Sequence, residues 1–390
     1  MSLKMEFAEK AAKPGTRMSA LCRQYGISRE TGYKWLNRFK RDGYNGLEEK
    51  SRRPRSTPLA TAEELVLAIL ESREAHPKWG PKKLGVVLRR RYAEQTPSDS
   101  TIARILRRFG RVRQRRAVRQ LSVVEKAPNV QAKVPNEIWT VDFKGWWRVR
   151  DGRRCEPLTV RDGFSRYVLA VKVMQSTKVD PVRSVFEKLF RKHGVPQMIQ
   201  CDNGSPFIST MARGGLTQLS AWWIALGIKV VRSRPGCPQD NGAHERMHRD
   251  LRADVELFPE GTLSAEQRAC EKWRQEFNHV RPHEALGGKT PAAIYRPTVR
   301  REAKIMTYVY PSGWLVRTVS PGGGISVQDD KYRAGRSLAG QRVGLEPLTG
   351  LRHRMWFRDL DLGELELCPS TETVSEAASK FTKHPLRKAA

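Results

Sequence analysis

The sequence has few of the features that mark common classes of protein. Its six cysteines are scattered over 390 residues and form no C-x-x-C pair. This distribution argues against a structural zinc module and against a disulfide framework. No run of about 18 apolar residues occurs, and the N-terminus lacks the apolar stretch of a signal peptide. We therefore expect neither a membrane span nor secretion, but a reducing compartment that contains DNA.

Acidic residues are also scarce relative to basic ones. The chain has 41 Asp and Glu against 72 Lys and Arg, which gives a formal net charge of +31 and a pI near 10.4. Such a positive field suits a polyanion. Solubility alone or an anionic membrane surface are the alternatives, but no amphipathic or lipid-anchor pattern accompanies the charge. Nucleic acid is the predicted partner.

The pattern of residues 1–48 predicts a helix-turn-helix module. A helix containing Leu21 is followed by Gly26, which suits a left-handed turn, and by Ser28, a good N-cap for a second helix. In that helix the polar side chains fall opposite Leu36, as in a DNA-recognition helix. A small helical hairpin with a solvated basic face is the alternative. The residues predicted to contact DNA here are Arg29, Thr31, Lys34 and Arg38.

Residues 61–110 have the pattern of a second helix-turn-helix module. Its last helix has Ser98, Asp99 or Ser100 as a possible cap. The buried face of this helix is predicted to hold Ile102, Ile105, Leu106 and Phe109. Its open face carries the predicted DNA contacts Arg104, Arg107 and Arg108.

Two arginine-rich linkers separate the predicted domains. Residues 49–60 form a basic linker with Pro and Ser, and residues 111–134 show no apolar period. Such arms lie along phosphates or in a minor groove, although a merely solvated tether is the alternative. The linker residues predicted to contact DNA are Arg52, Arg53, Arg111, Arg113, Arg115 and Arg116.

The pattern changes to strands at Pro135. Three β-rich runs separated by Asp-Gly turns precede alternating helices and strands, which predicts an α/β core with a mixed sheet over residues 135–298. Short strands with Gly-rich turns predict a small β-barrel over residues 303–368. Residues 369–390 are expected to be a disordered tail. The predicted fold is therefore multidomain: all-α modules, an α/β core and a C-terminal β-barrel.

Three acidic residues occupy positions that can converge at one edge of this sheet. Asp142 lies inside the first β run, Asp202 directly follows a short apolar strand, and Glu245 lies in the first turns of a helix. Carboxylates suit Mg²⁺, and two divalent ions about 3.5–4 Å apart can activate the attacking oxygen and stabilise the leaving oxygen of a phosphodiester. Without metal the acids would repel one another, so at least one pKa should be raised.

Each of these acids has a simpler interpretation when taken alone. Asp202 begins an ordinary Asp-Asn-Gly turn, Asp142 suits the polar face of a strand, and Glu245 suits the dipole of a helix N-terminus. Their order in a strongly basic chain favours a shared metal site. Asp162 is the nearest competitor, but it fits a hairpin turn in which its carboxylate bonds backbone amides.

The stretch His244-Glu245-Arg246-Met247-His248 also matches H-E-x-x-H, the helix of zinc proteases. That helix generally lies against an apolar interior and needs a third ligand. Here the helix carries a charged face that suits exposure to solvent, and it follows a run of Pro, Gly, Gln, Asp and Asn. We therefore interpret Glu245 as a magnesium ligand. Cations at i+3, i+4 and i+7 from it are predicted to face DNA, namely His248, Arg249 and Arg252.

Together these motifs resemble an insertion-sequence transposase with a retroviral-integrase-type core, of the DDE, ribonuclease H-like kind. The resemblance covers about residues 10–367. A trailing segment from Phe277 through Tyr295 also fits. The stretches that carry the resemblance are Trp139-Thr-Val-Asp142-Phe, Asp162-Gly-Phe-Ser-Arg166, Cys201-Asp-Asn-Gly-Ser-Pro-Phe207 and Ser233-Arg-Pro-Gly-Cys-Pro-Gln-Asp-Asn-Gly-Ala-His-Glu245.

The resemblance implies a recombinase that needs Mg²⁺, or Mn²⁺, with two ions held by Asp142, Asp202 and Glu245. It would act on double-stranded DNA as a dimer or tetramer. It would bind the inverted repeats at the ends of the element, cut to expose a 3′-hydroxyl and join that hydroxyl to target DNA. The resemblance further implies a protein of the prokaryotic cytoplasm, associated with the nucleoid and not with a membrane, for which an accessory target-selection protein is a possible partner. The Asp202–Glu245 spacing of 43 positions is longer than the commonest one in the family.

Other functions compatible with the residues remain open. A metal-dependent nuclease would cut DNA without joining it. A DNA-binding regulator with a silent core would bind the ends and do no chemistry. A zinc protease is the third alternative. The zinc domain of retroviral integrases has no counterpart here, because helix-turn-helix modules occupy its place.

Overall fold

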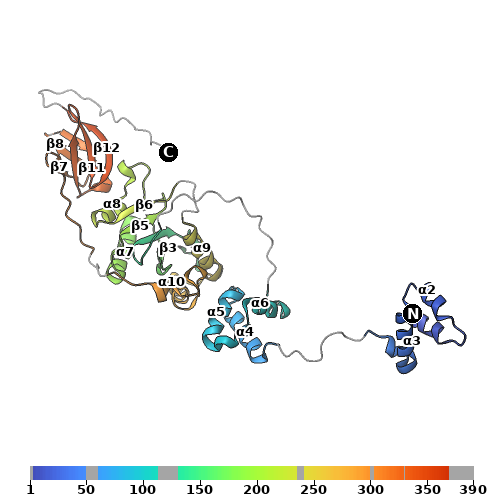
Figure 1. The fold of residues 1–390 in the computed structure, drawn as a ribbon. Helices are drawn as coiled ribbons and strands as arrows, with labels where there is room; N and C mark the ends of the chain where they lie inside the picture. Colours follow the sequence, from blue (N-terminus) through green and yellow to red (C-terminus); the bar gives the residue numbers. More distant parts are fainter. Residues whose placement is uncertain are drawn as a thin grey trace. The chain divides into compact units, whose positions relative to one another are not determined.

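The computed structural model describes residues 3–49, 60–112, 131–234, 241–298, 303–328 and 330–368. The chain divides into two compact units, Met1–Val66 and Leu67–Ala390. Along the chain, helices come first, then a mixed α/β region and finally strands (Figure 1). Within the described ranges, no helix has the length and apolar character needed to cross a membrane.

The first helix-turn-helix module consists of α1 (Leu3–Ala12), α2 (Met18–Gln24), α3 (Arg29–Asp42) and the short helix η1 (Gly43–Leu47). Ser28 caps α3 by accepting the backbone N–H of Thr31 at 3.1 Å. Gly26 turns the chain with a φ of +63°. Gly32 lets α3 approach α2 closely, because a Cβ there would lie 2.4 Å from Cys22 Sγ. The buried hydrophobic residues of this module are Phe7, Ala8, Ala11, Leu21, Cys22, Leu36 and Leu47.

The second helical module consists of α4 (Glu63–Ala75), α5 (Pro81–Tyr92), η2 (Ala93–Gln95) and α6 (Asp99–Arg108). Of the three possible caps, Ser98 is the one that accepts a backbone N–H, that of Thr101. The prediction of a buried Phe109 is wrong, since 46% of this residue is exposed. It forms the C-cap beyond the last packed turn, and the Arg108 guanidinium lies over its ring.

The central sheet is mixed, as predicted. Its strands are β1 (Ile138–Phe143), β2 (Trp147–Arg148), β3 (Arg154–Asp162), β4 (Val168–Met174), β5 (Met198–Cys201) and β6 (Lys229–Arg232). The order is β2-β3-β1-β5-β6, with β4 also paired to β3. Strand β3 is antiparallel to β1 and β4, whereas β5 is parallel to β1 and β6. The parallel pairs bring two chain-distant strand ends to the same edge.

Helices cover both faces of this sheet (Figure 1). Trp139 and Val141 pack with α7 (Val179–His193) and α8 (Gln218–Ala225) in one cluster. The other face meets α9 (Gly242–Leu251), the π-helical turn η5 (Arg252–Glu256) and α10 (Leu263–Gln275). The domain ends with η6 (Glu276–Val280), η7 (Glu284–Leu286) and α11 (Pro291–Ile294).

The predicted C-terminal β-barrel is not confirmed. Strands β7 (Leu315–Thr318), β10 (Arg342–Pro347), β11 (Arg352–Phe357) and β12 (Leu360–Glu366) form an antiparallel sheet in the order β12-β11-β10-β7. Strands β8 (Gly324–Val327) and β9 (Asp330–Arg333) form a separate hairpin. Among the described residues no ladder joins β12 to the hairpin, so the sheets remain open. The inner face of the larger sheet packs with Leu216, Ala221 and Ala225 in one buried cluster. The expected disordered tail lies outside the described residues.

Candidate active site

The parallel pairing of β1 and β5 aligns two of the predicted site acids. Ile138 pairs with Met198, and Thr140 pairs with Gln200. The same register, continued by two residues, brings Asp142 level with Asp202, which immediately follows β5. Asp202 is exposed, and its Oδ1 accepts the N–H of Gly204 at 3.2 Å in a tight turn.

Helix α9 brings Glu245 to the same site. This residue lies in the first turn of the helix and is exposed, whereas its neighbour His244 is buried against the sheet. Burial, together with the negative charges of Asp202 and Glu245, raises the pKa of Asp142 to about 7. All three acids thus lie within electrostatic range. The rise in pKa expected for at least one of them occurs at Asp142.

The face of the sheet beneath α9 is polar because apolar and polar residues alternate along β1 and β3. Asp142 pairs with Thr159, and Thr140 pairs with Arg161, so these four side chains share one face. The intervening Val141 and Val160, with Leu158, lie in the hydrophobic cluster on the opposite face. The repeated Thr-Val pattern therefore places β1 between an apolar core and a polar helix interface.

Two histidines of α9 fill this polar interface. His244 places Nδ1 2.8 Å from Thr140 Oγ1 and Nε2 2.7 Å from Thr159 Oγ1. His248 places its Nε2 2.7 Å from the same Thr159 oxygen. Burial lowers the pKa of His244 well below its usual range, and burial with the charges of Lys144 and Arg161 lowers that of His248 to about 3. Both rings are neutral at pH 7.

The position of His248 differs from the one expected from helical spacing. The buried stripe of α9 contains His244, Met247, His248 and Leu251, which recur at intervals of three and four residues. His248 therefore faces the sheet rather than DNA, and it carries no positive charge. Arg249 and Arg252 are exposed, and Arg252 Nε lies 3.4 Å from Glu256.

Although residues 244–248 match the H-E-x-x-H motif, their two histidines are not arranged as the paired zinc ligands of a zinc protease. Asp142, His244 and His248 each bring one possible ligand atom within 4.8 Å of the others. However, both ring nitrogens of His244 contact threonine hydroxyls, so binding a metal would cost it one of these hydrogen bonds. The carboxylates of Asp142, Asp202 and Glu245 are hard oxygen donors whose mutual repulsion a divalent cation relieves. This donor set fits Mg²⁺.

Asp162 has the structural role expected of a turn residue. Its carboxylate is buried and accepts the N–H of Asn136 and the N–H of Ser165, each at 2.7 Å. It also accepts the Ser165 hydroxyl at 2.5 Å. The Asp162 carboxylate thus accepts three hydrogen bonds, and these bonds stabilise the turn between β3 and β4.

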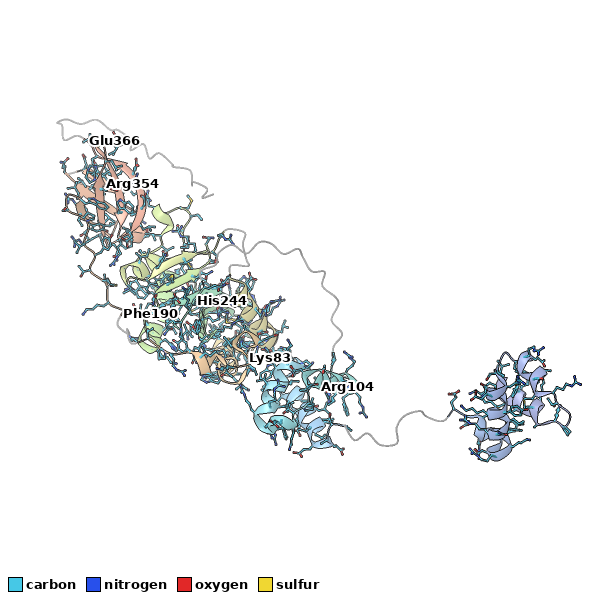
Figure 2. All side chains as sticks on the ribbon, in the orientation of Figure 1. Lys83, Arg104, Phe190, His244, Arg354 and Glu366 are labelled. Atoms are coloured by element: carbon cyan, nitrogen blue, oxygen red, sulfur yellow. The ribbon has the colours of Figure 1, made fainter. Side chains whose placement is uncertain are left out.

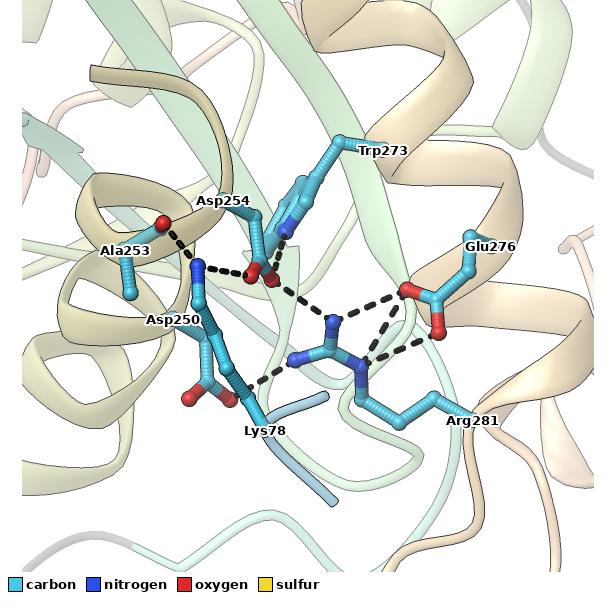
Figure 3. A network of polar contacts seen from close by, with 7 residues as sticks. All are labelled: Lys78, Asp250, Ala253, Asp254, Trp273, Glu276 and Arg281. Carbon is cyan, nitrogen blue, oxygen red and sulfur yellow. Dashed lines mark hydrogen bonds and ion pairs between the residues drawn. The ribbon is translucent and has the colours of Figure 1, made fainter. Parts of the chain in front are cut away.

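Sequence reasoning did not identify a buried ion network around Arg281 (Figure 3). The guanidinium contacts Asp250 at 3.1 Å, Asp254 at 2.8 Å and Glu276 at 2.9 Å. Trp273 Nε1 also donates to Asp254 at 3.0 Å. The network ties the end of α9 and η5 to η6, so it fixes the helix that carries Glu245. Aspartates four positions apart, followed by the Arg281-Pro-His segment, were the available signal.

Lys78 connects the second helical module to the same network. Its ammonium group donates to Asp254 Oδ1 at 2.8 Å and to the carbonyl oxygen of Ala253 (Figure 3). Lys78 lies in the loop between α4 and α5, and about half of its side chain is exposed. An exposed ion pair of this kind contributes at most about 1 kcal/mol to stability. Its main effect is therefore to orient the Asp254 side chain.

The predicted DNA contacts in the helical modules differ in accessibility. Arg29 and Lys34 are exposed on α3, Arg38 is half-buried, and Thr31 hydrogen-bonds the Ser28 cap. Arg104 is exposed on α6 (Figure 2), as are Arg107 and Arg108. Arg111 pairs with Glu74 at 2.7 Å. The remaining predicted contacts lie outside the described residues: Arg52, Arg53, Arg113, Arg115 and Arg116.

Comparison with known families matches both parts of this architecture. An integrase core domain family matches residues 132–238, and a second integrase core domain family matches residues 226–291. Over these two ranges the chain is similar to integrase core domains. A helix-turn-helix domain family matches residues 3–55, and a homeodomain-like family matches residues 31–106. The resemblance to insertion-sequence transposases with an integrase core is thereby confirmed.

The similar proteins include two from bacterial insertion elements. The insertion element IS407 uncharacterized 31.7 kDa protein of Burkholderia multivorans is 27% identical over 254 residues, which are 63% of this chain and 87% of that protein. The IS476 uncharacterized 39.2 kDa protein of Xanthomonas euvesicatoria is 25% identical over 249 residues, which are 63% and 69% of the two chains. The HTLV-2 integrase catalytic core domain in complex with magnesium is 20% identical, covers 43% of this chain and all of that chain, and has a TM-score of 0.34.

Proposed function

We propose that this chain is a DNA transposase. Its helix-turn-helix modules bind the terminal inverted repeats of an insertion sequence, and its integrase core cleaves each end to expose a 3′-hydroxyl and transfers it to target DNA. The helix-turn-helix and integrase core families and the insertion-element relatives support this role. Because two ends must be joined together, the active form is a dimer or tetramer assembled on DNA.

The observation that carries the proposal is the charge environment of Asp142. A mostly buried carboxylate that also feels the charges of Asp202 and Glu245 is a place where cation binding is strongly favoured. We assign these three residues as the ligands of two Mg²⁺ ions, with Mn²⁺ as a possible substitute. Such ions, when bound, supply activation of the attacking oxygen and stabilisation of the leaving oxygen.

The protein's own residues orient the DNA around that site. Arg249 and Arg252 lie on the exposed side of α9, one turn or more beyond Glu245, where they bind phosphates that flank the cut. The Arg281 network holds α9 in place, and Thr159 in the polar interface below the helix contacts both the Asp142 backbone and the two histidines of α9. The exposed arginines of α6 bind the end sequence. These assignments are proposals for the site residues and for the domain organisation given above.

The test uses the inverted repeats that flank the gene as substrate. Asp142→Asn, Asp202→Asn and Glu245→Gln should each abolish strand cleavage in Mg²⁺ and leave end binding intact in a mobility-shift assay. Asp180→Asn, an exposed acid on α7, is the matched control and should cleave normally. Full cleavage by any triad variant removes that residue from the site.

A second assay separates the proposed activity from its alternatives. A pre-cut end is mixed with supercoiled target DNA in Mg²⁺, and the joined product is measured. A transposase makes joined product, whereas a nuclease only cuts the target. A regulator with a silent core binds the ends and gives neither product.

A further inference from the structure

The hydroxyl group of Thr159 contacts three polar groups but has one proton to donate. Its Oγ1 lies 2.9 Å from the carbonyl oxygen of Asp142 and 2.7 Å from the Nε2 atoms of both His244 and His248. A carbonyl oxygen only accepts, so the hydroxyl proton goes to Asp142. Both imidazoles then donate their Nε2 protons to the lone pairs of the hydroxyl oxygen. The network thereby selects the tautomer of both neutral rings.

In this tautomer each Nδ1 carries a lone pair, and the two rings use it differently. Nδ1 of His244 lies 2.8 Å from Thr140 Oγ1, whereas the Arg161 carbonyl oxygen lies 3.5 Å from the same hydroxyl, so the Thr140 proton goes to the nearer Nδ1. Nδ1 of His248 lies 3.8 Å from Oδ2 of Asp142. That separation is too long for a hydrogen bond. When Asp142 is ionised, two electron-rich atoms therefore face each other with no proton between them.

We propose that a divalent cation lies between these two atoms, so that Nδ1 of His248 is a metal ligand beside Oδ2 of Asp142. This rests on the proposed function, in which Asp142 holds metal. Bonds of about 2.0–2.2 Å to nitrogen and oxygen place the two ligand atoms about 3.0–4.2 Å apart as the bond angle opens from a right angle to a line. The separation in the structure falls in this interval.

His244 is not a ligand, although it lies in the same group. Its two ring nitrogens are both occupied by threonine hydroxyls, and the residue is fully buried. Its hydrogen bonds instead hold His248 indirectly, because both rings share the Thr159 oxygen. The two histidines of one helix therefore have different roles, which makes each the control for the other.

A nitrogen ligand changes which cations the site prefers. Mg²⁺ prefers hard oxygen ligands. Imidazole suits softer ions, and the affinity of mixed nitrogen and oxygen sites rises from Mn²⁺ to Co²⁺ and Zn²⁺. We therefore expect Mn²⁺ and Co²⁺ to bind more tightly than Mg²⁺. A site of three carboxylates alone would show a weaker preference.

The experiment measures Mn²⁺ bound to the full-length, untagged chain without DNA. Pulsed electron paramagnetic resonance should show coupling between bound Mn²⁺ and one ¹⁴N nucleus. His248→Gln keeps an amide nitrogen near the former Nε2 position but removes the Nδ1 donor, so the coupling should disappear and Mn²⁺ affinity should fall about tenfold or more. His244→Gln should keep the coupling. Wild-type protein labelled with ¹⁵N-histidine should show the ¹⁵N pattern, which tests the ligand without any substitution.

The outcomes separate this inference from the proposed function. Mn²⁺ that binds in an Asp142-dependent way without nitrogen coupling overturns the His248 assignment and leaves the carboxylate site standing. If the coupling survives in His248→Gln but is lost in His244→Gln, the nitrogen ligand is His244, and the His248 assignment is again overturned. If Mn²⁺ binding is the same in wild type and Asp142→Asn, the cation site itself is refuted, and the proposed function fails with it.

Discussion

Asp142 and Thr159 face each other across the β1–β3 pair, and the Thr159 hydroxyl donates to the Asp142 carbonyl oxygen at 2.9 Å. The same hydroxyl accepts from two histidines of α9. One side chain therefore connects the strand that carries Asp142 to the helix that carries Glu245. We therefore expect the Thr159 hydroxyl to help set the position of Asp142 relative to Glu245.

Replacing Thr159 with Val tests this connection. The change preserves shape but leaves the Nε2 donors of His244 and His248 unpaired in a buried interface. We expect a loss of about 2–4 kcal/mol in the free energy of unfolding, since each buried unpaired group costs about 1–3 kcal/mol. Urea denaturation measures this loss. Thr318→Val, on the exposed end of β7, should change stability by less than about 0.5 kcal/mol. Equal stability of the two variants would contradict the proposed connection.

The raised pKa of Asp142 predicts a pH dependence of stability. Between its ordinary value near 3.8 and about 7, the folded protein holds a proton that the unfolded chain has released. The stabilisation is complete at low pH and is lost as the pH rises through 7, a change of about 2–4 kcal/mol. In Asp142→Asn this contribution is absent. The difference between the two unfolding curves isolates it, because the opposing contributions of His244 and His248, whose pKa values are lowered in the folded state, are present in both proteins.

Magnesium should remove the same destabilisation. Above pH 7 the ionised Asp142 is unfavourable without a cation, so saturating Mg²⁺ should raise the Tm of the wild type. Asp142→Asn should show a smaller rise. Differential scanning calorimetry with Mg²⁺ and with a chelator provides the comparison. Identical Mg²⁺ responses would place the cation elsewhere.

Arg281→Ala should be strongly destabilising. Three carboxylates would lose their shared partner, and the Arg281 side chain is only 7% exposed. We expect a loss of about 2–4 kcal/mol, below the value for a fully buried pair because the acids are partly exposed. Lys82→Ala is the control, since its pair with Glu284 is exposed on both sides and its loss should leave the stability almost unchanged. A similar Tm for both variants would refute a structural role for the network.

Arg104→Ala and Arg107→Ala should weaken binding to the element ends and flatten its salt dependence. Each lost phosphate contact reduces the slope of log K against log salt by about 1. Fluorescence anisotropy at several salt concentrations measures the slope. Arg354→Ala, on the C-terminal sheet and already paired with Glu364, serves as the control. An unchanged slope in the α6 variants would exclude this helix from the DNA interface.

Local patterns were sufficient for much of the architecture. Ser28 and Ser98 cap their helices because a short side-chain oxygen reaches the N–H three residues ahead. The alternation Thr140-Val141-Asp142 assigns opposite faces to neighbouring residues in any strand. The short strand before Asp202 and the parallel order of β1 and β5 then bring the acids to one edge. These relations depend on spacing within one element or on general rules of sheet topology.

The remaining features depend on contacts between residues far apart in the chain. Helical spacing placed His248 on the face of Glu245, but the Thr159 hydroxyl, 89 positions away in sequence, draws it toward the sheet. Arg281 became recognisable as a buried ion only when η5 and η6 were brought together. The sequence pattern predicted the C-terminal strands, but it does not determine which strand edges pair with each other. The amino-acid sequence by itself determined which residues could face inward; the tertiary structure decided which partner each one meets, because burial energy depends on neighbours that local spacing does not specify.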